Sequence, residues 1–173
     1  MTMGPGLRKL ALTAHVTSSV GWLGAVAVFV ALAIVGLTSP DDRSVRGAYL
    51  LMERAAWLVL VPASLASLVT GVVSSLGTPW GLLQHYWVVI KLLLNVFATV
   101  VLLIYMGTFR AMAGVAADPA SALEDVRNPS PLLHALLALV LLLVATVLGV
   151  YKPQGMTRHG WRKRRGGLTA PPP

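Results

Sequence analysis

The chain has 173 residues, of which 56% are hydrophobic and only 12% charged, and its mean hydropathy is +0.75. Soluble domains carry roughly 25% charged residues, so this composition excludes an ordinary soluble fold. Cysteine is absent, which excludes disulfides, thiolate metal sites, iron–sulfur clusters and cysteine nucleophiles. The net charge of +8 suits either nucleic acid or an anionic membrane surface, and the positions of the basic residues decide between them.

The apolar residues gather into four runs, each long enough to cross about 30 Å of hydrocarbon. They cover residues 10–37, 55–76, 86–109 and 131–151. A lone apolar segment can satisfy its backbone in lipid only as a helix. The sequence therefore predicts an all-α membrane protein, a four-helix transmembrane bundle over residues 1–155. Its glycine and serine faces could also pair two copies as a homodimer.

The first run follows Arg8 and Lys9, as a signal peptide would. It is much longer than the roughly 7–15 apolar residues of a signal sequence, which predicts an uncleaved helix. The first two runs are separated by a turn, Ser39-Pro40-Asp41-Asp42. Asp41 or Asp42 is expected to cap a helix over residues 43–54.

One face of the first span gathers polar and aromatic side chains. They recur at positions i, i+3, i+4 and i+7, which share a helix face: His15, Ser18, Ser19 and Trp22. An ionisable side chain in hydrocarbon is costly and is a functional candidate by default. The alternative for His15 is a neutral structural histidine bonded to a serine of a neighbouring helix.

The third span carries Lys91 and Asn95, four residues apart and thus on one face. His15 and Lys91 each lie about five residues inside the same end of their spans, so roughly 7–8 Å deep. His134 starts the fourth span at the other end, about 15–20 Å from His15 along the membrane normal, so the two should not clamp one haem. Alternatively, Lys91 snorkels to the headgroups, and His85 is simply interfacial.

The basic residues concentrate after the last span. Six of them lie between positions 152 and 165: Lys152, Arg158, Arg162, Lys163, Arg164 and Arg165. Such a cluster beside a span suits anionic lipid headgroups better than nucleic acid. Four spans place both termini on one side of the membrane. Outside the spans, that side carries eight Lys and Arg residues and the opposite side carries five. Because loops rich in Lys and Arg stay in the cytoplasm, this difference predicts cytoplasmic termini in the inner (plasma) membrane. The tail, residues 156–173, is expected to be disordered.

Three short motifs resemble known membrane families. His15, Trp22 and Gly24 form H-x6-W-x-G, which resembles the first helix of CopD-type copper-resistance proteins and HemJ-type protoporphyrinogen oxidases. The segment from Trp87 to Leu92 resembles their lysine-bearing third helix, and Tyr151-Lys152-Pro153 resembles the Lys-Pro after the last HemJ-type helix. The whole chain looks most similar to a bacterial integral membrane family, domain of unknown function 2269.

The resemblance implies b-type haem or a porphyrin bound near the cytoplasmic side. His15 would be the axial ligand, Lys91 would pair with a propionate, and Trp22 would pack on the macrocycle. Ser18, Ser19 and Asn95 would complete the site. The chain departs from the HemJ pattern, in which a histidine stands close before the lysine, because His85 is six residues away; His85 is a weaker metal candidate.

An enzyme of this kind would be a haem- or porphyrin-linked membrane oxidoreductase, whose redox partner the sequence does not identify. Two other functions stay open. One is a small transporter or CopD-like copper-uptake component, although the methionines form no spaced ladder and no cysteine supplies soft ligands. The other is a non-catalytic structural or interaction protein, which would not depend on His15 or Lys91.

Overall fold

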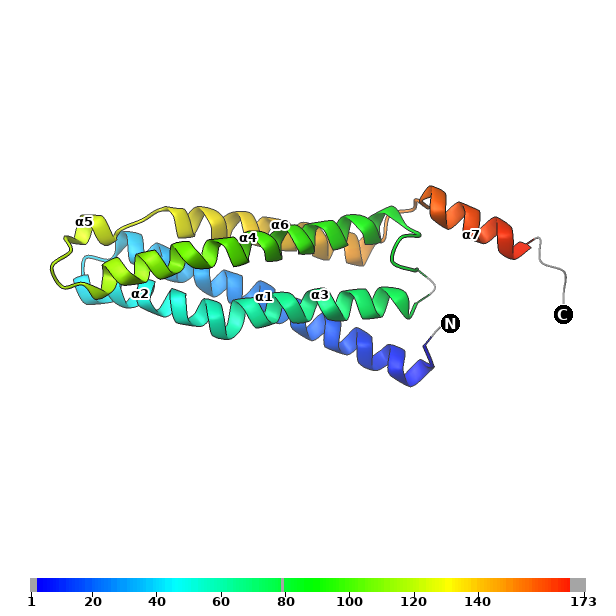
Figure 1. Cartoon of the computed structure of the whole chain (residues 1–173), viewed down its shortest axis with the longest axis horizontal. Helices are drawn as coiled ribbons and strands as arrows, with labels where there is room; N and C mark the ends of the chain where they lie inside the picture. The colour runs from blue at the N-terminus through cyan, green and yellow to red at the C-terminus, as the bar shows by residue number, and fades with distance from the viewer. Residues whose placement is uncertain (1–2, 79, 169–173) are drawn as a thin grey trace.

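The structure, a computed structural model, describes residues 3–78 and 80–168, which form helices and connecting turns without a strand (Figure 1). The helices are α1 (Pro5–Thr38), α2 (Asp42–Ala55), the π-helical turn η1 (Ala56–Leu60), α3 (Val61–Leu76), α4 (Tyr86–Ala117), α5 (Leu123–Val126), α6 (Ser130–Tyr151) and α7 (Arg158–Leu168). Within the described residues, four helical stretches are long and apolar enough to cross a membrane. The predicted all-α bundle is therefore confirmed.

The second stretch is one continuous rod from Asp42 to Leu76, formed by α2, η1 and α3. Its wide turn η1 comes just before Pro62, which has no backbone N–H to donate to the preceding turn. A π-helical turn absorbs this defect without ending the helix, and the Val61 N–H bonds back to the Ala56 carbonyl. The rod exceeds the predicted span because α2 buries an apolar face of Val45, Tyr49 and Met52.

The predicted helix after the first turn is present, and Asp41 is its N-cap. The Asp41 carboxylate accepts hydrogen bonds from the Ser44 backbone N–H at 3.0 Å and from the Ser44 hydroxyl at 2.7 Å. These bonds lower the pKa of the Asp41 carboxyl, the side-chain bond contributing most. Asp42, the other candidate, instead pairs with Arg46 at 2.9 Å.

Two arginines close the end of the bundle opposite the termini. Arg127 donates to the carbonyls of Leu37 and Ser39, where α1 ends. Arg46 donates to the Ala116 carbonyl in the last turn of α4 at 3.3 Å and to the Asp118 carbonyl just beyond it at 2.8 Å. The last carbonyls of a helix have no partner within the helix, so these guanidinium groups satisfy them.

The hydrophobic core lies mainly in the half of the bundle opposite the termini. Its largest side chains come from α1, α2 and α4: Trp22, Phe29, Tyr49, Met52, Tyr105 and Phe109. Towards the termini, the first half of α1 diverges from α6, and both ends of the chain lie at that end (Figure 1). The bundle is thus tightly packed at one end and looser at the other, which is called the terminal end below.

The basic tail differs from the expected disorder, because Arg158–Leu168 forms helix α7. Thr157 begins it: its hydroxyl accepts from the Gly160 N–H at 3.1 Å, and its own N–H donates to the Gln84 carbonyl at 2.9 Å. A side-chain cap of this kind satisfies one of the free donors of a helix start. The last part of the predicted tail, residues 169–173, lies outside the described residues.

Candidate functional site

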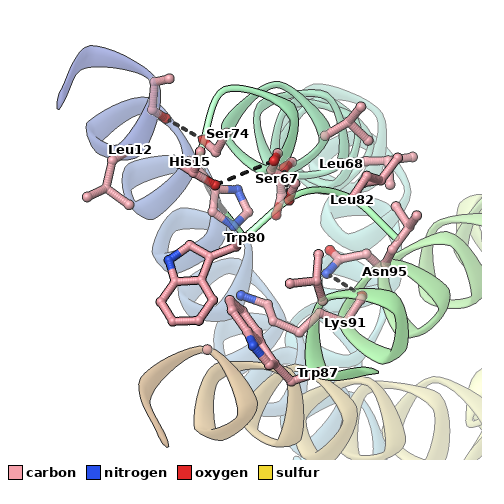
Figure 2. A pocket seen from close by; sticks show the side chains of 18 of the residues that line it. Leu12, His15, Ser67, Leu68, Ser74, Trp80, Leu82, Trp87, Lys91 and Asn95 are labelled. Carbon is pink, nitrogen blue, oxygen red and sulfur yellow. Dashed lines mark hydrogen bonds between the residues drawn. The ribbon is translucent and has the colours of Figure 1, made fainter. Parts of the chain in front are cut away.

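A cavity of about 440 Å³ opens among α1, α3, α4 and the last turn of α6, at the terminal end (Figure 2). We call it the polar cavity. Its polar and aromatic lining residues are Arg8, His15, Ser67, Ser74, Ser75, Thr78, Trp80, Trp87, Lys91, Asn95 and Lys152. The volume falls within the roughly 300–1,000 Å³ of small-molecule and cofactor sites.

His15 reaches this cavity from α1 and packs on α3. Its Nδ1 lies 3.3 Å from the Thr70 hydroxyl, whose own proton is donated to the Ala66 carbonyl at 2.6 Å. The Thr70 oxygen can therefore accept from Nδ1–H, and in that tautomer the lone pair of the imidazole lies on Nε2. Gly71 makes this placement possible, because a Cβ there would come within 3.0 Å of the imidazole Cε1.

Lys91 reaches the same cavity from α4 (Figure 2). Among the described residues its ammonium has no hydrogen-bond or ion-pair partner. The Lys91 Nζ lies against Gly149 of α6, where a Cβ would approach it to 2.8 Å. The absence of a side chain at Gly149 thus leaves room for the ammonium.

Two further polar atoms at this cavity have no partner in the described part of the chain. They are the indole Nε1 of Trp87 and the amide Oδ1 of Asn95, both buried. The Asn95 Nδ2 donates to the Lys91 carbonyl at 3.1 Å, and the side chain is only 9% exposed. An unsatisfied buried polar group costs roughly 1–3 kcal/mol, so these two atoms lower the stability of the terminal end of the bundle.

The cavity carries positive charge without a compensating acid. Arg8, Lys91 and Lys152 line it, and no aspartate or glutamate is among its described lining residues. Lys152 also places its Nζ 5.6 Å from the centre of the Trp80 ring, and the Trp80 and Trp87 rings meet edge to face at 5.7 Å. The arrangement suits a ligand with an anionic edge and a flat apolar body.

Three of the six predicted cofactor-binding residues lie outside this cavity. Ser18 contacts the Thr70 hydroxyl at 3.2 Å, and Ser19 contacts the Ser67 hydroxyl at 2.8 Å, so both join α1 to α3. Trp22 is 2% exposed and lies in the core. The spacing correctly puts these residues on one side of α1, but that side faces α3 and the core over most of its length.

The remaining histidines have separate surroundings. His85 precedes α4, and its Nδ1 lies 2.8 Å from the Trp80 carbonyl, to which it donates. It packs edge to face on the Trp80 ring and does not line the polar cavity as described. His134 lies at the opposite end of the bundle, with Tyr105. No group of three or more histidine or acidic side chains among the described residues could hold a bare metal ion.

Sequence reasoning missed several residues of this site. Trp87 precedes Lys91 by four residues, so helical periodicity alone predicts that the two share a face. Trp80 lies in the loop before α4, and Gly149 lies on α6; neither carries a sequence signal that links it to Lys91.

Compared with protein-family models, curated proteins and solved structures, the chain matches none. The resemblance to CopD-type and HemJ-type proteins therefore stays a prediction from short motifs. What is established is a polytopic membrane protein with four apolar helices and a basic, partly aromatic cavity at its terminal end.

Proposed function

We propose that this protein binds an anionic porphyrin, most simply haem b, in the polar cavity, in support of membrane redox chemistry. The observation that carries the proposal is the unpaired ammonium of Lys91, facing the same cavity as His15. Removing a charge from water costs several kcal/mol, so an ammonium without a carboxylate calls for an anionic partner. A porphyrin propionate would supply one.

The residues around the cavity fit such a group in three respects. The free lone pair of His15 Nε2 is available for iron, and its Nδ1–H is held by Thr70, as metal-bound histidines usually are. The indole rings of Trp80 and Trp87 offer flat apolar surface. One imidazole is enough for haem, which explains how a site without a cluster of metal ligands could still hold iron.

The proposal differs from the expected site in its aromatic residue. Trp22 is part of the core, so Trp80 and Trp87 take the role of packing against the macrocycle. Ser18 and Ser19 position α1 against α3 and thereby hold His15 in place, rather than contacting the ligand. Asn95 stays in the site as a lining residue of the polar cavity, although its Oδ1 is buried.

When bound, haem would supply one-electron transfer, while a free porphyrin would be a substrate for oxidation. The protein's own part would be ligation by His15, charge neutralisation by Lys91 and exclusion of water by the two indoles. The copper-uptake and structural alternatives predict no pigment.

The test is a visible absorption spectrum of the full-length protein, purified in detergent after haem-replete expression. We expect a Soret band that His15→Ala abolishes and that His134→Ala, the matched control at the opposite end of the bundle, leaves intact. A Soret band unchanged by His15→Ala, or no band at all, would overturn the haem assignment.

Lys91 is tested separately with metal-free protoporphyrin, followed by its fluorescence. Lys91→Gln should weaken binding by about tenfold to a hundredfold, the worth of a hydrogen-bonded charge. His15→Ala should weaken this binding much less, because there is no iron to ligate. Equal affinity of wild type and Lys91→Gln would contradict the proposed propionate contact.

A further inference from the structure

A second cavity, of about 360 Å³, lies in the other half of the bundle. We call it the aromatic cavity. It is enclosed by α1, η1, α4 and α6, and its lining includes Trp22, Phe29, Phe97, Tyr105, Phe109 and His134. The described lining residues of the two cavities do not overlap. A ligand in this second cavity would therefore contact none of the residues proposed to bind the porphyrin.

One corner of the aromatic cavity is polar. The Nδ1 of His134 lies 2.9 Å from the Ser130 carbonyl, which can only accept, so Nδ1 carries the proton. The neutral ring then bears a lone pair on Nε2, which has no partner among the described residues. Tyr105 stacks on this ring at 4.2 Å and donates its hydroxyl to Ser130 Oγ at 2.8 Å.

The hydrogen bonds at this corner determine whether His134 can donate or accept a further bond. The Ser130 carbonyl holds Nδ1–H and Ser130 Oγ receives the Tyr105 proton, so the acceptor left on the lining residue His134 is Nε2. A ligand would thus have to bring the donor. This requirement distinguishes the cavity from one that merely holds lipid chains.

The other lining residues indicate the charge and shape of a ligand that would fit the cavity. No Asp, Glu, Lys or Arg is among the described residues that line the cavity, so a charged ligand would lose its hydration without compensation. The rings of Phe29 and Phe109 meet edge to face at 5.6 Å, and Tyr105 continues the series at 4.9 Å from Phe109. Aromatic walls of this kind favour a flat, neutral ring.

We propose that the aromatic cavity binds a neutral, membrane-soluble aromatic alcohol with the chemistry of a quinol headgroup. Its ring lies among the aromatic walls, its hydroxyl donates to His134 Nε2, and its apolar tail extends between the helices. Leu137 of α6 lines the cavity and is 59% exposed, which gives such a tail a route to the lipid.

The test uses the full chain in lipid nanodiscs with a photoreactive azidoquinol. Cross-linked peptides are mapped by mass spectrometry, and labelling is competed with decylubiquinol. We expect competable labels on α4 and α6 at the cavity. A second competitor, the dimethyl ether of decylubiquinol, lacks the hydroxyl donors and should compete about fivefold to tenfold less well, since one hydrogen bond is lost.

Variants on α6 separate this cavity from the lipid-facing surface. Ala138→Trp should fill the cavity and abolish competable labelling, whereas Val140→Trp, on the exposed face, should leave it unchanged. His134→Phe keeps a flat ring and should erase the difference between quinol and ether. Melting curves of all three variants confirm that they fold.

Three results would overturn the proposal. Equal competition by quinol and ether would mean that the cavity does not recognise a hydroxyl and holds apolar chains only. Equal loss of labelling in Ala138→Trp and Val140→Trp would mean that the probe labels the helix surface. Absence of competable labelling would mean that no such site exists. None of these results depends on whether haem is bound.

Discussion

At the residue scale, Lys91 is a charged side chain inside a transmembrane helix that has no partner of opposite charge among the described residues. Its ammonium is placed beside Gly149 rather than beside a carboxylate, and the hydrogen-bonding atoms near it on Trp87 and Asn95 are unpaired in the described structure. Stability alone would not select this combination, because an apolar side chain of similar length would fill the same space without the charge. These unpaired groups thus destabilise the protein at the polar cavity, where we propose that a porphyrin binds.

Replacing this lysine with an apolar residue tests the cost directly. We expect Lys91→Met to raise the melting temperature of the ligand-free protein by about 2–4 °C, roughly 1 kcal/mol for a chain of this size. Lys9→Met, close to the chain terminus, is the matched control and should have no effect. A lower melting temperature in Lys91→Met would show that the ammonium stabilises the fold, as a snorkelling lysine would.

Residue by residue, the sequence predicted part of the site. The cost of placing an ionisable side chain in hydrocarbon singled out His15 and Lys91, and the structure shows that both line one cavity. Their predicted depth in the membrane stays a prediction. Trp22 could not be placed, because helical periodicity gives the face of a residue but not the neighbour that covers it. That depends on how α1 crosses α3 and α6.

At the element scale, α2 shows how a capped helix start extends a transmembrane helix beyond its apolar stretch of sequence. Hydropathy alone starts the second span near residue 55, whereas the helix begins at Asp42. The turn before it and the Asp41 cap were both predictable, because Ser-Pro-Asp is a strong helix-start signal. The π-turn at Ala56–Leu60 was not predicted, since Pro62 signals a disturbed helix without saying how the backbone adapts.

The Asp41 cap predicts a pH dependence of stability. Its carboxyl pKa is lowered in the folded state, so the cap contributes above the unfolded pKa of about 3.9 and is lost as the pH falls through the folded value. Asp41→Ala should lower the melting temperature at pH 7 by about 2–4 °C and flatten this acid-dependent loss. Asp41→Asn keeps the acceptor and should melt near wild type at pH 7. Identical melting of wild type and Asp41→Ala at pH 7 would contradict the cap.

At the scale of the whole molecule, the two halves of the bundle differ in packing. The half opposite the termini holds most of the large buried side chains, and two arginines satisfy its helix ends. The terminal half holds the polar cavity, with small residues such as Gly71 and Gly149 beside it. The number and order of the four helices follow from hydropathy alone, but this asymmetry emerges only from their crossing.

Hydrogen–deuterium exchange in detergent would measure the asymmetry. Amides of α1 in residues 8–15 should exchange at least about tenfold faster than those in residues 26–36, because fewer buried contacts oppose local opening there. Adding protoporphyrin should slow exchange in the first segment alone. Uniform exchange along α1 would contradict the difference in packing, and slowing in both segments would contradict binding at the terminal end.

The hydrogen bonds from Arg127 to the Leu37 and Ser39 carbonyls hold the end of α1 in place. The other half of α1, which carries His15, is bonded to α3, since Ser18 contacts Thr70 and the Ser74 hydroxyl donates to the Ala11 carbonyl. α1 is thus held at both ends, so the position of the His15 imidazole beside α3 should stay fixed when the polar cavity is filled or emptied.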